Sequence, residues 1–264
     1  MKVKDLMKTN LKVIDSNDNL RNAIKIMKKY NISRLLVKKN GKIVGILSER
    51  DISDRLGRLE TTPLSDAHVH VSSAYVDKLI TINENADLKL AAKMMLENKI
   101  SSLVVTNDSN EIVGIITKSD LINVLENSSI PVSKYASKKI INLKVGSSLL
   151  HARRLMLDNN VKRVLITFDS EVVGIITESD IANFLGMFRK VSEGVQWYNK
   201  LKTINVEDIM SRDVVVINEN STLGDAVKLM KKNDISGLPV VNNQNKLAGI
   251  ITKTDLIRAI VDLY

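Results

Sequence analysis

Apolar residues along this chain follow two periods that alternate in a fixed order. Segments with an apolar residue every three or four positions, as at residues 20–27 and 223–230, predict amphipathic helices. Short apolar runs, as at residues 35–37 and 238–241, predict strands. A polar turn, a second strand and a further helix follow each run, and a short strand precedes each first helix. The order strand, helix, strand, strand, helix recurs four times, which indicates internal repetition.

One seven-residue phrase is shared by all four repeats and leads from the last strand into the last helix. It consists of a glycine, two apolar residues, a hydroxyl residue, two variable residues and an aspartate. The four copies occupy residues 45–51, 114–120, 174–180 and 249–255. A methionine lies 24 or 25 residues before each aspartate, at Met27, Met95, Met156 and Met230. We expect these methionines to fill the core.

The spacing of the phrase sets the bounds of the repeats. Repeats 1 to 4 are predicted at residues 1–56, 66–125, 132–185 and 206–264. Residues 186–205 form a longer connector with apolar and aromatic residues at helical spacing, and this connector contains the single tryptophan, Trp197. We predict an amphipathic connector that packs against one of the folded modules, with a partner-binding helix as the alternative.

Composition limits the classes of function. The chain has 264 residues, of which 44% are hydrophobic and only 3% aromatic, so aliphatic residues and methionine must build the core. No window is apolar enough for a membrane span, and the N-terminus lacks the apolar stretch of a signal peptide, so a cytoplasmic protein is expected. The absence of cysteine excludes disulfides and thiolate metal sites. The net charge of +9 suits anionic ligands or loose attraction to nucleic acid, and a solvated basic surface equally well.

These repeats resemble the CBS domain family, which is named after cystathionine β-synthase. The phrase matches the C-terminal signature of that family, and residues 235–241 match its mid-repeat loop. The resemblance covers nearly the whole chain. It implies an α/β (α+β) fold of four β-α-β-β-α repeats, in which consecutive repeats pair about a pseudo-twofold axis into Bateman modules at 1–125 and 132–264. Two modules would stack into a flat disc, within one chain or in a homodimer.

The hydroxyl and the aspartate of the phrase have two interpretations. As a capping box, the hydroxyl residue is the N-cap of the last helix and the aspartate reaches back to it, which needs no ligand. As a ligand site, the helix N-terminus favours a phosphate, the hydroxyls donate to it, and the aspartate accepts hydrogen bonds from ribose hydroxyls. The resemblance implies the second role for adenosine ligands. The candidates for ribose and phosphate binding are Asp255, Thr252, Thr254, Asp120, Thr117, Ser119, Asp180, Thr177, Ser179, Asp51, Ser48 and Arg50.

The resemblance also implies that the mid-repeat loop and the leading strand flank the adenine base. The matching residues are Ile32, Arg34, Ile80, Ile100, Ser102, Ile141, Val161, Arg163, Val215, Ile235, Gly237 and Pro239, with Lys12 at the leading-strand position of repeat 1. Arg34 and Arg163 are expected to neutralise phosphates. The family's loop proline is present only as Pro239, and Lys12 replaces an apolar residue. Repeat 4 is therefore predicted to be the best-formed site, followed by repeat 2.

Other motifs add little chemistry. The phrase glycines lie inside strands, where close packing between paired sheets is favoured over the approach of a ligand. His68 and His70 have the spacing of a metal pair, but no cysteine or acidic cluster completes a site, so no metal is predicted. The sequence contains no Walker loop, nucleophile elbow, HExxH or Rossmann glycine series, which argues against an enzyme and against a catalytic cofactor.

The leading hypothesis is therefore a regulatory sensor of AMP, ADP or ATP that transmits ligand occupancy to an effector protein. A sensor of S-adenosylmethionine or a related ligand is the first alternative. A regulator associated with nucleic acid is the second, although no nucleic-acid-binding signature supports it. A scaffold subunit of a larger complex, with vacant clefts, is the third.

Overall fold

The structure is a computed structural model that describes residues 1–58, 69–169, 171–191 and 196–264. The chain divides into two compact units. Unit 1 comprises Met1–Leu11, Ile80–Ile140 and Val215–Tyr264, and unit 2 comprises Lys12–Leu79 and Ile141–Val214. Unit 1 thus contains the bodies of repeats 2 and 4, and unit 2 contains those of repeats 1 and 3. The predicted modules pair repeat 1 with repeat 2 and repeat 3 with repeat 4, and the two repeats of each pair belong mainly to different units. This pairing stays a prediction.

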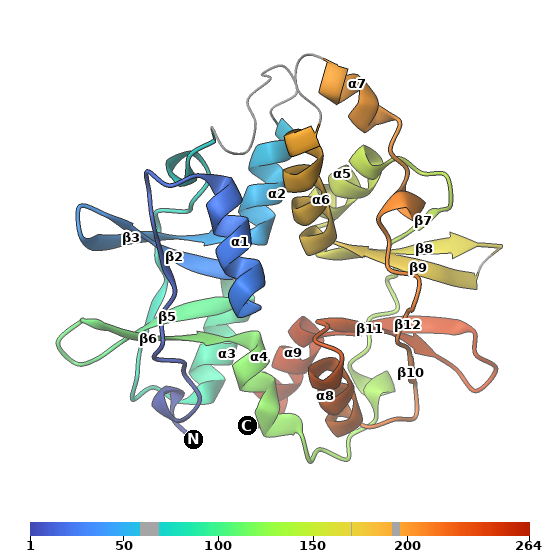
Figure 1. The fold of residues 1–264 in the computed structure, drawn as a ribbon. Coiled ribbons are helices and arrows are strands. Elements are labelled where there is room, and N and C mark those ends of the chain that lie inside the picture. Colours follow the sequence, from blue (N-terminus) through green and yellow to red (C-terminus); the bar gives the residue numbers. More distant parts are fainter. Residues whose placement is uncertain (59–68, 170, 192–195) are drawn as a thin grey trace. The chain divides into compact units, whose positions relative to one another are not determined.

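The predicted order of elements is confirmed in all four repeats (Figure 1). In unit 1, repeat 2 has β4 (Thr81–Asn83), α3 (Leu88–Glu97), β5 (Ser102–Thr106), β6 (Ile112–Thr117), α4 (Lys118–Leu121) and η3 (Ile122–Leu125), and repeat 4 has β10 (Ile217–Asn218), α8 (Leu223–Lys232), β11 (Gly237–Val241), β12 (Leu247–Thr252) and α9 (Lys253–Leu263). In unit 2, repeat 1 has β1 (Val13–Asp15), α1 (Leu20–Tyr30), β2 (Arg34–Lys39), β3 (Lys42–Ser48) and α2 (Glu49–Arg58), and repeat 3 has β7 (Asn142–Lys144), α5 (Leu149–Asp158), β8 (Arg163–Phe168), β9 (Glu171–Thr177) and α6 (Glu178–Val191).

Each repeat forms one three-stranded sheet with the same topology. The first strand pairs in parallel with the second, and the second pairs antiparallel with the third, as in the order β1-β2-β3. The helix between the first two strands supplies the crossover that a parallel pair requires. As a result, the first two strands begin, and the third strand ends, at the same edge of each sheet.

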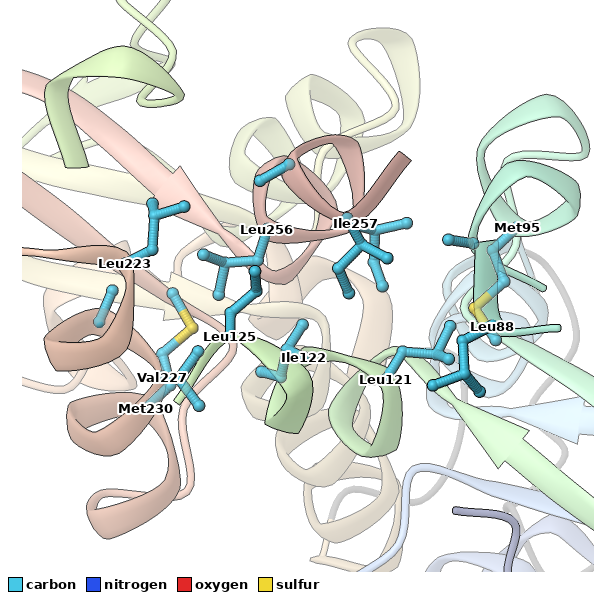
Figure 2. Close-up of a cluster of buried hydrophobic side chains, with 14 of the residues drawn as sticks. Leu88, Met95, Leu121, Ile122, Leu125, Leu223, Val227, Met230, Leu256 and Ile257 are labelled. Atoms are coloured by element: carbon cyan, nitrogen blue, oxygen red, sulfur yellow. The ribbon is translucent and has the colours of Figure 1, made fainter. Parts of the chain in front are cut away.

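Each unit has its own hydrophobic core, and two repeats share it. In unit 1 the core lies between the helices of repeats 2 and 4 (Figure 2). Its labelled side chains are Leu88, Met95, Leu121, Ile122, Leu125, Leu223, Val227, Met230, Leu256 and Ile257. In unit 2, helix α2 packs against α6 in the corresponding way. All four repeated methionines are at most 3% exposed, which confirms them as core residues. Burial of one such side chain stabilises the fold by about 1.5–3 kcal/mol.

The connector packs within unit 2. Helix α6 continues past the predicted end of repeat 3 to Val191, and α7 (Gln196–Lys202) follows. Leu201 of α7 is fully buried in the core of unit 2, and α7 contacts α5. The prediction that the connector packs against a folded module holds for this part. The predicted role of Trp197 concerns a side chain outside the described part of the chain.

The leading segment of every repeat lies in the unit that holds the body of its neighbour. Each such segment contains a 3-10 turn: η1 (Val3–Asp5), η2 (Val71–Ser73), η4 (Val132–Lys134) and η5 (Val206–Asp208). The first residue of each turn is a fully buried valine. Val3 of repeat 1 donates its backbone N–H to Ala86 of repeat 2 at 2.9 Å, and Val71 of repeat 2 donates to Asp18 of repeat 1 at 2.8 Å. Repeats 3 and 4 exchange their leading segments in the same way, through Val132 and Val206.

This exchange explains the phrase glycines. Each lies beside a β-bulge in its strand and faces the exchanged segment. In repeat 4, Ser137 and Ile250 exchange backbone hydrogen bonds of 2.9 Å across Gly249. A Cβ at Gly249 would lie 2.8 Å from the carbonyl oxygen of Ser137. Packing was the favoured interpretation, and it is confirmed. The packed partner is the exchanged segment, however, and not a paired sheet.

We therefore expect Gly249→Ala to lower the free energy of unfolding by about 1–3 kcal/mol, because the new methyl group meets a hydrogen-bonded backbone that cannot yield. The matched control is Gly174→Ala in repeat 3, where the nearest atom is Sδ of Met210, at 2.3 Å from the built Cβ. A flexible methionine can move, so this loss should be smaller. Chemical denaturation measures both; equal losses would contradict the backbone explanation.

Candidate functional site

The aspartate of every phrase caps the helix that follows it. In all four repeats its Oδ2 accepts two hydrogen bonds from the hydroxyl residue, one from the backbone N–H at 2.8 Å and one from the side-chain hydroxyl at 2.6–2.7 Å. The pairs are Ser48 with Asp51, Thr117 with Asp120, Thr177 with Asp180 and Thr252 with Asp255. The capping box is thus present, and it contributes on the order of 1 kcal/mol to each helix. It uses one oxygen of each aspartate and leaves the other for further partners.

The second aspartate oxygen distinguishes the two units. In unit 1, Oδ1 of Asp120 lies 3.4 Å from Nζ of Lys8, and Oδ1 of Asp255 accepts a hydrogen bond from Arg258. Both aspartates are buried. In unit 2, Asp51 and Asp180 are half-buried, and no cation within the described residues forms an ion pair with their Oδ1 atoms. The aspartates of repeats 1 and 3 are therefore more accessible than those of repeats 2 and 4. The loop sequences predict the opposite order, with repeat 4 as the best-formed site, followed by repeat 2.

The predicted loop residues lie beside the capping hydroxyls. Arg34, Ser102, Arg163 and Gly237 each begin the second strand of a sheet and pair across the ladder with Ser48, Thr117, Thr177 and Thr252, respectively. The leading residues lie at the same edge, since the carbonyls of Lys12, Ile80 and Ile141 accept hydrogen bonds of 3.0–3.2 Å from the second strands. The structure therefore brings loop, leading strand and aspartate together at one edge of each sheet.

The apolar loop residues also stabilise the repeat itself. Ile32, Ile100, Val161 and Ile235 donate their backbone N–H to the core methionine of the preceding helix at 2.9–3.0 Å. Their side chains, and those of Ile80, Ile141 and Val215, are partly buried against the core. Lys12 differs from its counterparts, because its ammonium lies 4.2 Å from the ring centroid of Tyr30 in a cation–π contact.

Pro239 changes the leading strand of repeat 4. In the other repeats, the residue at its position donates its N–H to the leading-strand carbonyl, as Leu36 does to Lys12 at 3.0 Å. Proline has no N–H to donate, so the corresponding bond to Val215 cannot form. Strand β10 accordingly begins only at Ile217. The carbonyl of Val215 therefore lacks this strand partner at the edge where the loop and the aspartate meet.

The two variable residues of the phrase contact the other repeat of the same unit, an arrangement that sequence reasoning did not predict. In unit 1, Lys118 donates to Thr254 at 3.0 Å and Lys253 donates to Ser119 at 2.9 Å. These bonds are reciprocal between repeats 2 and 4, and they engage the hydroxyls that were expected to face a phosphate.

Unit 2 makes the same reciprocal contacts with glutamates in place of the two lysines. Ser179 donates to Glu49, and Nε of Arg50 lies 3.1 Å from Oε1 of Glu178. The first variable residue is thus Glu in repeats 1 and 3 and Lys in repeats 2 and 4. This alternation was the signal in the sequence that could have singled out Glu49, Lys118, Glu178 and Lys253, which contact the other repeat of their unit.

The carboxylates of unit 2 lie among several cations. Burial raises the pKa of Glu49 and that of Glu178, while nearby cations oppose the shift: Arg34 and Lys162 for Glu49, and Lys162, Arg50 and Arg163 for Glu178. Lys162 is an exposed residue, but many protein atoms surround its ammonium group and reduce the hydration of that group. This desolvation, reinforced by the charges of Arg34, Arg50 and Arg163, lowers the pKa of Lys162 to about 8, and Glu178 opposes the shift.

The described residues contain no group of three His, Cys, Asp or Glu side chains that could hold a metal ion. His70 Nδ1 lies 2.7 Å from the carbonyl oxygen of Asn17, and His68 is outside the described residues. None of the described helices is long and apolar enough to cross a membrane.

Comparison with known sequences decides the family. The CBS domain family matches residues 3–58, 71–127, 132–186 and 206–262. The chain belongs to the CBS domain family. The four matched ranges begin at the buried valines of the leading segments, so the CBS repeat includes the segment that is exchanged.

Several archaeal proteins are similar over most of this chain. The uncharacterised protein MJ1225 of Methanocaldococcus jannaschii is 29% identical over 259 residues, which cover 90% of this chain and 91% of that protein. Its crystal structure, described as that of a proposed archaeal homologue of γ-AMPK, covers 98% of this chain and 99% of its own, with a TM-score of 0.87 and 26% identity. MJ1404 of the same organism is 28% identical over 99% of this chain and 62% of its own length. A conserved protein from Pyrococcus horikoshii has a TM-score of 0.65 and 25% identity, covering 99% of this chain and 100% of its own.

The charges around Lys162 predict the direction of two pKa changes. Glu178→Gln should lower the pKa of Lys162 further below its value of about 8, because it removes a carboxylate that favours the ammonium. Arg34→Gln should raise the same pKa, because it removes a repelling cation. The ¹³Cε shift of Lys162, assigned with Lys162→Arg and followed by NMR against pH, measures both changes. Shifts in the same direction would contradict this account.

Proposed function

We propose that this CBS-domain protein is a regulatory sensor that binds adenine nucleotides (AMP, ADP or ATP) and transmits their occupancy to an effector protein in the cytoplasm. One observation carries the proposal. In every repeat, a helix-capping aspartate, a hydroxyl residue, a loop residue and a leading strand meet at one sheet edge. The similarity to MJ1225 over nearly the whole chain supports it, since that protein is described as a proposed homologue of γ-AMPK.

The ribose is the part of the ligand that the aspartates suit. A carboxylate oxygen that remains available beside a helix N-terminus can accept a hydrogen bond from a ribose hydroxyl. In repeats 1 and 3 the capping box occupies Oδ2 and leaves Oδ1 of Asp51 and Asp180 for this role. In repeats 2 and 4 a ribose must compete with Lys8 or Arg258 for the same oxygen. Ribose binding is therefore proposed first for repeats 1 and 3.

The adenine base is matched most closely in repeat 4. The carbonyl of Val215, which Pro239 deprives of its strand partner, is an acceptor that suits the exocyclic amino group of adenine. Gly237 lies at the same sheet edge, and Ile235, just before it in the chain, is an apolar residue packed partly against the core. A site that combines these features selects adenine by a backbone acceptor and by apolar contact.

The cations favour nucleotides over S-adenosylmethionine. Both ligands contain adenosine, so the ribose and base contacts do not separate them. Arg34 and Arg163 lie next to the capping hydroxyls of repeats 1 and 3, where the 5′ substituent of the ribose would extend. A phosphate at that position is attracted by a guanidinium, whereas the sulfonium of S-adenosylmethionine is repelled by it.

The exchanged leading segments support the pairing of repeat 1 with repeat 2 and of repeat 3 with repeat 4 in modules. A ligand that contacts one repeat can influence its neighbour through such a segment. The influence can only be as large as the difference in the ligand's affinity for the two arrangements of the module.

We expect Asp180→Ala to weaken AMP binding at one site by roughly 2 kcal/mol, through the loss of a charge-assisted hydrogen bond to ribose. The matched control is Asp225→Ala. Asp225 forms a capping box of the same geometry with Thr222 on α8, outside the phrase, with Oδ2 at 2.7 Å from the threonine hydroxyl. Both variants should lose similar thermal stability.

Isothermal titration calorimetry with AMP, ADP and ATP, combined with thermal melting, measures these effects. Only Asp180→Ala should change nucleotide affinity. Equal loss of stability in both variants with unchanged affinity in both would leave the aspartates as helix caps alone, and the ribose contact would have to be abandoned.

A further inference from the structure

Unit 2 contains a group of six charged side chains where repeats 1 and 3 meet, here called the charged cluster. Its members are Arg34, Glu49, Arg50, Lys162, Arg163 and Glu178. Glu49 and Glu178 are the first residues of α2 and α6, helices of 10 and 14 residues. Arg163 is 8% exposed and Glu178 9%, whereas Arg34, Glu49 and Arg50 are half-buried and Lys162 is exposed. Asp51 and Asp180 lie close enough to act on these carboxylates.

The fold does not require these carboxylates. At the same two positions unit 1 has Lys118 and Lys253, which join repeats 2 and 4 through single hydrogen bonds to hydroxyls. Removing charges from water costs several kcal/mol per ion unless their partners are well placed. Oε1 of Glu178 accepts no hydrogen bond of good geometry within the described residues, although Nε of Arg50 lies 3.1 Å away. The pairing of charges in the cluster is therefore imperfect.

The carboxylates also hold the groups that would otherwise serve a phosphate. Ser179, which the phrase predicts as a phosphate donor, donates instead to Glu49. Arg50, predicted for the same role, lies against Glu178. Both carboxylates lie at the start of a helix, where the free N–H groups and the partial positive charge favour an anion. In unit 2, a carboxylate thus contacts two of the groups that the sequence predicts for phosphate binding.

We propose that Glu49 and Glu178 are internal anions that compete with the phosphate groups of ligands for the cations of the charged cluster. The proposal rests on the proposed function and adds a regulation to it. The side chains act by position and charge, and no bond is made or broken. Unit 2 would bind an organic phosphate only when its two glutamates move away from the cations of the charged cluster or become protonated.

A count of formal charges gives the physical reason. The four cations and two glutamates of the charged cluster carry a formal charge of +2, and the neighbouring Asp51 and Asp180 bring this sum to zero without a ligand. A phosphate dianion would leave a surplus of negative charge in a poorly hydrated place. The same burial that raises the pKa of Glu49 and of Glu178 makes them the groups that can accept protons when this happens. Each further phosphate group on a ligand increases this surplus of negative charge.

The test is the double variant Glu49→Gln with Glu178→Gln, titrated with AMP and with adenosine. Glutamine keeps an acceptor for Ser179 and Arg50 but removes the negative charge. We expect AMP affinity to rise about tenfold or more, because two like charges near the phosphate disappear. Adenosine affinity should not change, because adenosine has no phosphate.

The matched control is Asp54→Asn, which removes the charge from an ion pair that joins the same two repeats, between Asp54 and Arg153 at 3.0 Å. It should lower the melting temperature without tightening AMP binding. If the double variant binds AMP equally or more weakly than the wild type, the glutamates only hold repeats 1 and 3 together, and the proposal is wrong.

Failure of the proposed function is distinguishable from failure of this inference. A wild-type protein that binds neither AMP nor adenosine refutes the adenosine sensor. The wild type and the double variant are then titrated with inorganic pyrophosphate. Tighter pyrophosphate binding by the double variant would retain the competition for phosphate, whereas equal or absent binding would refute it as well.

Discussion

The antiparallel bridge between each phrase strand and the leading segment of the neighbouring repeat is the interaction on which the rest of the structure depends. The outer strands β3, β6, β9 and β12 are sheet edges, which would leave backbone groups unpaired. The bridge satisfies part of this edge, as between Ile46 and Val76, whose N–H and C=O groups exchange hydrogen bonds of 2.9 Å. Glycine is needed at the residue just before the bridge, here Gly45, because a side chain there would occupy the space of the crossing segment.

The exchange has consequences for both the core and the site. It places a buried valine of one repeat in the hydrophobic core beside its neighbour, so that a repeat cannot complete its core alone. It also carries Lys8, which belongs to the leading segment of repeat 1, to the capping aspartate of repeat 2. The packing of the segment and the electrostatics around the capping aspartate are therefore linked, because Lys8 belongs to the element that ties two repeats together.

The two units use one backbone geometry for different electrostatics. The helix caps have the same distances in all four repeats, within 0.1 Å. Around these caps, unit 1 places lysines against hydroxyls, and unit 2 places glutamates among arginines and a lysine. A capping box stabilises the helix in either setting, so the cap alone does not reveal the difference. The charges next to the cap are what can make sites of the same shape differ in their ligands.

The sequence by itself determined the repeat, the order of its elements, the core methionines and the capping pairs, because all of these depend on local periodicity and short spacing. That the loop and the leading strand lie near the aspartate was implied by the resemblance to the CBS domain family, and the strand pairing of the structure brings these residues to one edge of each sheet. Only the tertiary structure decided which repeats share a core, which segment crosses each glycine and which cation reaches each aspartate. Lys8 and Asp120, or Glu49 and Ser179, are more than a hundred residues apart in the chain. No local pattern encodes such contacts, because they depend on how the apolar faces of separate repeats are buried against each other.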